Sequence, residues 1–254
     1  ADLACEKEIW DRCINTSDRT RNEIDLEQRF PTPFRDDVIA QAKSIGLDPA
    51  YVYGLIRQES RFIIDARSNV GASGLMQVMP ATARWTAKKI GLPFTDALIA
   101  DRNTNLKIGT AYLKLVLDDF DGSQAMAAAA YNAGPSRPRR WREGATLEPA
   151  IWAENIPFAE TRDYVKKVLS NATVYASLLA GKKQSAAALP APPALPSVPE
   201  ASASGAASGV APAVDAPAPP PPPPPLLLPS LKARLGAPIG PRDLAAAPPD
   251  KELP

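Results

Sequence analysis

Apolar residues recur every three or four positions between residues 36 and 180 of this chain. This spacing is typical of α-helices that bury one face against a core. No segment shows the sustained alternation of apolar and polar residues that marks a half-buried strand, so the pattern predicts an all-α domain. The expected helices lie at residues 5–14, 36–44, 49–58, 81–90, 103–120, 124–132, 148–153 and 159–180, with a basic loop at 135–144.

Local start and stop signals support these helices. Asp48 stands before Pro49 as a predicted N-cap, and Ser123 takes the same place before an alanine-rich segment. Gly91 and Gly134 follow their helices as stop signals. We predict one domain at residues 34–181, preceded by a charged segment, 1–33, that is the remnant of an upstream linker or helical region.

The composition changes at residue 182. Residues 182–254 are rich in alanine, proline and serine, and they include the unbroken proline run at 219–225. Such a segment buries too little apolar surface to offset the entropy of ordering, so it is predicted to be a disordered Pro/Ala-rich tail. The proline run favours polyproline II. We favour a passive tail over a ligand for the aromatic groove of a protein partner.

Charge and residue usage exclude several classes of function. The 29 basic and 28 acidic residues give a net charge of +1, which argues against a nucleic-acid partner because such partners usually require a basic face. No run of about 18 apolar residues occurs, so no transmembrane segment is expected. The chain has no histidine. This removes Ser-His-Asp and Cys-His catalysis and every histidine metal site, and we expect neither metal nor cofactor.

The two cysteines, Cys5 and Cys13, allow two interpretations. They either form a disulfide that closes a short loop, which would indicate an oxidising compartment, or remain unpaired thiols in a terminal segment. Two cysteines alone cannot supply the four ligands of a structural zinc site.

Glu59 is the candidate for acid–base chemistry. It lies on the same helical stripe as Val52, Leu55 and Ile56, in the last turn of a helix that is expected to end near Glu59 and Ser60. If the stripe faces the core, burial and the negative end of the helix dipole both raise the pKa of Glu59. A carboxylic acid that stays protonated near neutral pH suits general acid catalysis. The alternative is a frayed helix end at which Glu59 faces water and pairs with Arg61.

Four motifs extend this interpretation. They are RQES at 57–60, GASGLMQVMP at 71–80, AAAYNAGP at 128–135 and ENIPFAETRDYVKKVL at 154–169. In this order they resemble the C-terminal catalytic domain of the soluble lytic transglycosylases, which cut bacterial peptidoglycan. The resemblance covers most of residues 34–180. It implies a lysozyme-like, goose-type-like helical domain with one catalytic glutamate.

The resemblance also implies roles for individual residues. Glu59 matches the acid/base, Ser68 a serine near the N-acetyl group of the reacting sugar, and Glu160 a second acidic residue that contacts glycan. Tyr131 matches a tyrosine close to the catalytic site. The expected substrate-binding residues are Ser60, Ser68, Gln77, Met79, Tyr131, Asn132, Glu160 and Tyr164.

The reaction that the resemblance implies is cleavage of the β-1,4 bond between N-acetylmuramic acid and N-acetylglucosamine. Glu59 protonates the glycosidic oxygen and then removes the proton of the C6 hydroxyl, which leaves a 1,6-anhydro end. One alternative is a hydrolytic muramidase, which needs a second carboxylate such as Asp65, Asp101 or Glu160. Another is a non-catalytic glycan-binding or scaffold module in which Glu59 is structural.

The same resemblance implies a monomer that acts on peptidoglycan glycan strands in the periplasm of a Gram-negative bacterium. The chain begins at Ala1 and shows no signal-peptide pattern. We interpret it as a processed product or an excised fragment.

Overall fold

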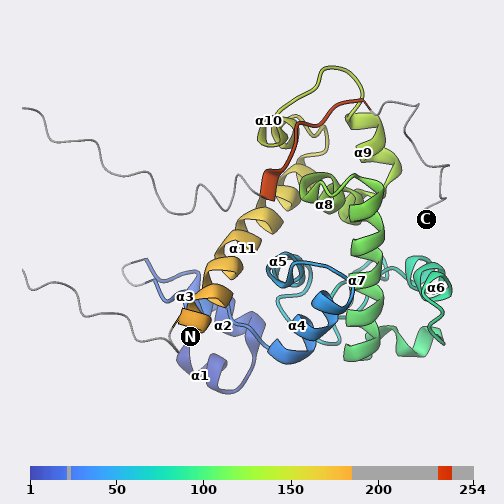
Figure 1. Cartoon of the computed structure of the whole chain (residues 1–254). Coiled ribbons are helices and arrows are strands. Elements are labelled where there is room, and N and C mark those ends of the chain that lie inside the picture. The colour runs from blue at the N-terminus through green and yellow to red at the C-terminus, as the bar shows by residue number, and fades with distance from the viewer. Residues whose placement is uncertain (22–23, 185–233, 242–254) are drawn as a thin grey trace, which may run out of the picture.

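A computed structural model gives the fold and describes residues 1–21, 24–184 and 234–241 (Figure 1). Over these ranges the structure has helices and isolated β-bridges but no strand, so the all-α prediction is confirmed. No helix in the described part of the chain is long and apolar enough to cross a membrane. The elements are α1 (Asp2–Glu6), α2 (Trp10–Ser17), α3 (Leu26–Arg29), α4 (Arg35–Ser44), α5 (Pro49–Glu59), α6 (Pro80–Lys89), η1 (Asp96–Ala100), α7 (Arg102–Asp119), α8 (Gln124–Ala133), α9 (Ser136–Trp141), α10 (Pro149–Glu154) and α11 (Ala159–Gln184).

Helix α5 lies at the centre of the domain, and α4 and α11 pack directly against it (Figure 1). The contact with α11 is closest at Gly54. A Cβ atom at this position would lie 2.7 Å from the Val168 carbonyl oxygen and 2.8 Å from the Ala172 nitrogen. Glycine is therefore required for this contact, which brings side chains of α11 to the end of α5.

Helix α8 fills the interior because its side chains are small. Ala125 and residues 127–130 are 0% exposed. The helix begins at Ser123, whose hydroxyl accepts a hydrogen bond from the Met126 amide, as the N-cap prediction requires. The buried hydroxyl of Tyr51 on α5 donates to the carbonyl of Gln124, so α8 is joined to the first turns of α5.

Two sequence-based helix assignments were wrong. Residues 135–144 were expected to be a loop but contain α9, because Pro138 lies in the first turn, where proline is tolerated. The helix expected at 5–14 is two helices, α1 and α2. Glu8 between them takes a positive φ of 56°, which no continuous α-helix accommodates. The short helices α3 and η1 were not predicted.

The N-terminal segment packs against the domain that follows it. Ile14 of α2 is fully buried in the same apolar core as α5 and α11. The hydroxyls of Tyr53 and Tyr175 donate to the carbonyls of Pro33 and Pro31, respectively, which ties the end of this segment to both helices. Residues 1–33, expected to be a remnant of an upstream region, therefore contribute to the core.

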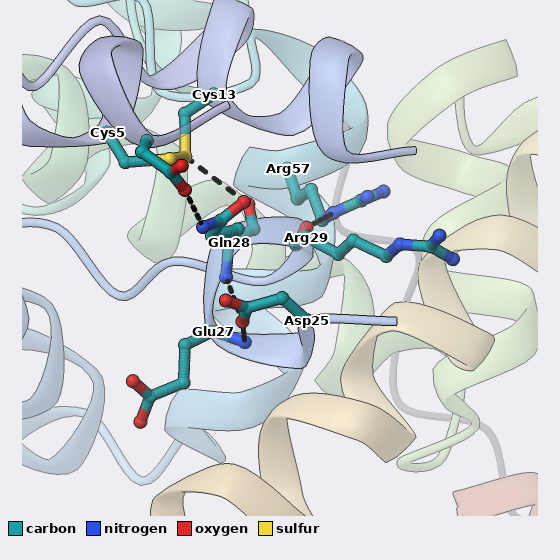
Figure 2. Close-up of a disulfide and its surroundings, with 8 residues drawn as sticks. Cys5, Cys13, Asp25, Glu27, Gln28, Arg29 and Arg57 are labelled. Carbon is teal, nitrogen blue, oxygen red and sulfur yellow. Dashed lines mark hydrogen bonds between the residues drawn. A yellow bond between two sulfur atoms is a disulfide. The ribbon is translucent and has the colours of Figure 1, made fainter. Parts of the chain in front are cut away.

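Cys5 and Cys13 are joined in a disulfide, which resolves the two interpretations of the sequence (Figure 2). The bond connects α1 to α2, and Cys13 is 1% exposed. Next to it, the side-chain Nε2 of Gln28 on α3 donates to Asp2 Oδ1. The carbonyl of Arg29, also on α3, accepts a hydrogen bond of 2.9 Å from the Arg57 guanidinium on α5 (Figure 2). The disulfide-linked segment is thus attached to the helix that ends at Glu59.

The expectation of a disordered tail over all of residues 182–254 does not hold for residues 234–241. Helix α11 continues to Gln184, and residues 234–241 lie against the domain, shown in red in Figure 1. Ile239 is 3% exposed and belongs to the core, because its apolar side chain is removed from water there. The other tail residues, including the proline run at 219–225, lie outside the described residues.

Candidate active site

The apolar stripe of α5 faces the core as expected. Val52, Leu55 and Ile56 are each 0% exposed, and Glu59 follows them at the boundary of the core, where it is partly buried. The helix starts sharply because the Asp48 side chain accepts from the Ala50 amide at 2.9 Å and Pro49 occupies the first turn. The frayed helix end with Glu59 turned to water is excluded.

The chain reverses directly after Glu59. Arg61 and Phe62 both take positive φ angles, and Phe62 is buried. The Ser60 hydroxyl accepts a hydrogen bond of 3.1 Å from the Phe62 amide, and Ser60 is 7% exposed. Ser60 therefore stabilises the turn that ends α5, and its substrate-binding role stays a prediction.

Glu59 is held by a tyrosine from α11. The Tyr164 hydroxyl donates to Glu59 Oε1 at 2.5 Å. Burial raises the pKa of Glu59 from 4.5 to about 7, and the hydrogen bond from Tyr164 opposes this shift by stabilising the carboxylate. Burial, reinforced by the negative charge of Glu59, also raises the pKa values of Tyr131 and Tyr164, so both tyrosines lie within its electrostatic reach.

The loop of residues 66–78 carries the expected substrate-binding residues Ser68 and Gln77. Its backbone closes through paired hydrogen bonds between Ser73 and Val78, and the Ser68 hydroxyl accepts from the Ala72 amide. Gln77 takes a positive φ of 46°, and its side-chain NH2 group donates to the carbonyls of Ala66 and Gly74. The expected groove residues Ser68 and Gln77 are therefore fixed by the loop itself.

Asn105 of α7 anchors this loop, although the sequence did not identify it. Its Nδ2 donates to the carbonyls of Ser73 and Ile99, and its Oδ1 accepts from the Met76 amide. Asn105 is 1% exposed. One turn further along α7, Gly109 leaves room for Met76, because a Cβ there would lie 2.7 Å from Met76 Cβ. The available signal was an asparagine within the apolar repeat of this helix.

Helix α8 contacts the site at its C-terminal end. The Tyr131 hydroxyl donates to the Met76 carbonyl at 2.9 Å, which joins α8 to the loop. The next residue, Asn132, accepts a hydrogen bond of 2.7 Å from Thr161 in the first turn of α11. Tyr131 and Asn132 thus hold the loop, α8 and α11 together around Glu59. Thr161 is a second residue that the sequence did not identify.

The structure separates Glu160 from Tyr164, although both lie on α11. Tyr164 is 6% exposed and reaches Glu59, whereas Glu160 is exposed in the first turn. Met79 is 40% exposed at the start of α6 and presents an apolar side chain to solvent. Among the described residues, no group of three or more acidic or cysteine side chains could hold a metal ion.

Two family models match the chain. Residues 37–150 match the Transglycosylase SLT domain. Residues 155–184 match the soluble lytic transglycosylase helical domain.

Individual relatives and solved structures agree with these models. The soluble lytic murein transglycosylase of Salmonella typhimurium is 35% identical over 187 residues, which are 72% of this chain and 29% of that protein. An inactive mutant of the lytic transglycosylase Slt of Pseudomonas aeruginosa matches with a TM-score of 0.68 and 40% identity, covering 70% of this chain and 30% of that one. The 70 kDa soluble lytic transglycosylase of Escherichia coli matches with a TM-score of 0.65 and 34% identity, covering 70% of this chain and 29% of that one.

The chain spans less than a third of the length of these relatives. Within the matched part, residues 37–150 match one family model, and the helical arrangement is that of the lytic transglycosylase structures. This domain belongs to the transglycosylase SLT family.

Proposed function

We propose that the domain is a peptidoglycan lytic transglycosylase that uses Glu59 as its single acid and base. The observation that carries the proposal is a carboxyl group at the edge of the core, with a pKa of about 7 and a tyrosine donor. Near neutral pH such a group populates both protonation states, which is what a residue that first gives and then takes a proton requires. The relative from Pseudomonas aeruginosa offers a parallel, because its inactive form carries a glutamate-to-glutamine exchange.

In the first step, protonated Glu59 gives its proton to the glycosidic oxygen between N-acetylmuramic acid and N-acetylglucosamine, and the bond from C1 to that oxygen breaks. The 2-acetamido group of the substrate stabilises the cationic centre, as in substrate-assisted glycosidases. In the second step, ionised Glu59 removes the C6 hydroxyl proton, and O6 bonds to C1. The product is a 1,6-anhydro end, and no water is consumed.

Tyr164 serves both steps in this proposal. Its hydroxyl donates to Glu59 Oε1 and stabilises the carboxylate that forms after proton transfer. Burial alone would raise the pKa of Glu59 further, so the tyrosine brings the value back toward neutrality. The loop of residues 66–78, together with Met79 and Glu160, forms the proposed glycan contact.

Hydrolysis would need a second carboxylate, and the positions of the three candidates, Asp65, Asp101 and Glu160, favour the single-glutamate reaction instead. Asp101 is the N-cap of α7, where its side chain accepts from the Thr104 amide at 2.8 Å. Asp65 and Glu160 are exposed, in contrast to Glu59. Hydrolysis would require one of these three carboxylates to activate a water across the sugar from Glu59.

Product analysis tests the proposal. Purified peptidoglycan digested with the wild-type protein should release muropeptides with 1,6-anhydro ends, detected by mass spectrometry. Hydrolysis would instead give reducing ends heavier by one water. The Glu59→Gln variant should release neither product. Release of 1,6-anhydromuropeptides by this variant would overturn the assignment of Glu59.

The Cys5–Cys13 disulfide supports an oxidising compartment such as the periplasm as the site of action. We further propose that the protein acts as a monomer. Light scattering of the purified protein tests this point, and a dimer mass would contradict it. A protein partner for the proline-rich residues stays a prediction.

A further inference from the structure

The C-terminal residues 234–241, called here the strap, return to the domain after a long stretch of chain and contact it at two separate places. Figure 1 shows the strap in red, running beside α10 towards the end of α9. Its first residue contacts the start of α5, and its last residues contact the segment between α9 and α10. Residues far apart in the sequence are thereby joined.

The contact at the start of α5 is an ion pair. The Arg234 guanidinium lies 2.7 Å from Asp48 Oδ2, and its side chain is only 9% exposed. Asp48 uses its other oxygen, Oδ1, to cap α5. Leu235 packs against the apolar core beside this pair. A charged side chain so deeply covered needs a partner, and Asp48 supplies it.

The contact between α9 and α10 resembles the addition of a strand. The Leu147 amide donates to the Ile239 carbonyl at 2.8 Å, and the Ile239 amide donates to the Leu147 carbonyl at 2.7 Å. Arg142 Nε donates to the Gly240 carbonyl at 2.8 Å. Gly240 has no side chain to collide with Thr146, whose Cβ would lie 3.0 Å from an added Cβ.

These contacts have the form in which proteins bind extended peptides. Backbone pairing supplies affinity, and a pocket for one side chain supplies specificity, here for buried Ile239. We propose that Asp48, Arg142, Thr146 and Leu147 form a peptide-docking surface, and that the strap is its ligand within the same molecule. The preferred ligand is a segment with an arginine in a short helical turn, followed five residues later by an isoleucine that forms a β-bridge and then by a glycine.

Docking of the strap fixes the segment that connects α9 to α10. Residues 143–146 are exposed, and beside them Leu147 is held by two backbone hydrogen bonds to the strap. Residues 185–233 give ample reach from the end of α11, because an extended chain covers about 3.3 Å per residue. Asp48 and Glu59 are separated by the length of α5, about 16 Å at 1.5 Å per residue. The strap is therefore expected to affect stability and leave the rate constant at Glu59 unchanged.

Hydrogen exchange on the full-length chain tests the proposal. In the wild type the Leu147 amide should exchange slowly. Ile239→Asp places a charge in the pocket, and it should accelerate this exchange by at least about a hundredfold and lower the Tm by roughly 5–10 °C. Arg234→Gln is milder and should accelerate the exchange several-fold. A chain that ends after Pro241 removes only residues 242–254 and should behave as the wild type.

Equal exchange of Leu147 in the wild type and in Ile239→Asp would overturn the proposal. Protection of Leu147 should also stay constant over about a hundredfold range of protein concentration, because docking within one molecule does not depend on concentration. Protection that increases with concentration would mean that the strap docks onto a second copy, and it would overturn the assignment within one molecule. Neither measurement depends on the proposed enzymatic activity.

Discussion

Helix α5 carries a carboxylate at each end, and the two ends use it differently. Asp48, at the start, accepts from the Ala50 amide and pairs with Arg234. Glu59, in the last turn, is partly buried and accepts from the neutral hydroxyl of Tyr164. The helix dipole favours negative charge at the first end and disfavours it at the second. Asp48 therefore lies where the dipole favours a carboxylate, whereas burial at the other end raises the pKa of Glu59 to about 7.

The difference shows how one helix supplies both stability and reactivity. A carboxylate surrounded by amide and guanidinium donors stabilises the folded state through its charge. A carboxylate at the edge of an apolar core destabilises that state when it is ionised, and it gains the ability to exchange a proton near neutral pH. Substitutions at the two ends should therefore separate catalysis from stability.

Glu59→Gln should cause the largest change in rate. Glutamine has nearly the same shape but cannot transfer a proton, and a general acid contributes about 10²–10⁴-fold. Because Glu59 serves both steps of the proposed reaction, we expect turnover to fall by at least about 10³-fold, measured by release of soluble muropeptides. Asp48→Asn is the matched control and should keep the wild-type rate. A similar loss in both variants would mean that the effect arises from the helix rather than from the acid.

The same substitution should change how stability depends on pH. The pKa of Glu59 is about 7 in the folded protein against 4.5 for the free side chain, so the folded state binds the proton more tightly. Protonation of Glu59 therefore contributes fully to the free energy of unfolding below pH 4.5, and this contribution is lost as the pH rises to about 7. The loss is at most about 3 kcal/mol, from 1.36 kcal/mol per unit of pKa shift.

Denaturant unfolding between pH 4.5 and 8 measures this effect. Glu59→Gln should remove the decline and be more stable than the wild type at pH 8. The carboxylates Asp96 and Asp101 do not obscure the window, because hydrogen bonds lower their pKa values below the ordinary 3.8. Parallel curves for the wild type and the variant would show that Glu59 is not desolvated in the folded state.

Tyr164→Phe tests how the Tyr164 hydroxyl sets the pKa of Glu59, at the C-terminal end of α5. Loss of the hydroxyl removes the one hydrogen bond that lowers the pKa of Glu59, so this pKa should rise above about 7. The alkaline limb of the kcat/KM profile should then move to higher pH, with kcat reduced about tenfold by the loss of one positioned hydrogen bond. Tyr112→Phe is the control, because the ring of Tyr112 packs against Tyr131, with centroids 5.4 Å apart, and Tyr164 rather than Tyr112 donates the hydrogen bond to Glu59. An unshifted profile in Tyr164→Phe would exclude its effect on Glu59.

The reactive end of α5 could be predicted from sequence because its signals are local. The spacing of Val52, Leu55, Ile56 and Glu59 defined the buried stripe, and burial of the three apolar residues confirms it. The sequence assigned both Glu160 and Tyr164 to substrate binding, and they lie four residues apart on one helix. Their spacing could not distinguish the buried tyrosine at Glu59 from the exposed glutamate.

Contacts between distant segments could not be predicted. Asn105 holds the loop at Ser73 and Met76, and although a polar residue within an apolar repeat marks it as unusual, the sequence does not say which segment it binds. The ordered strap at residues 234–241 could not be predicted from the sequence, for a second reason. Composition averages over many residues, whereas docking depends on a few, such as Arg234 and Ile239, within a segment dominated by alanine, proline and serine.

Of the substitutions at the two ends of α5, Asp48→Asn should have the smallest effect, and this effect should be on stability alone. Asparagine is an equally good N-cap, so the start of α5 should persist while the charge that pairs with Arg234 is lost. Asp48 is 40% exposed, and solvent weakens such a pair, so the free energy of unfolding should fall by only about 1 kcal/mol. This corresponds to a Tm lower by roughly 2–4 °C in a calorimetric scan. A fall in turnover at a temperature well below this Tm would show that the two ends of α5 are coupled, and would contradict the separation of stability from catalysis.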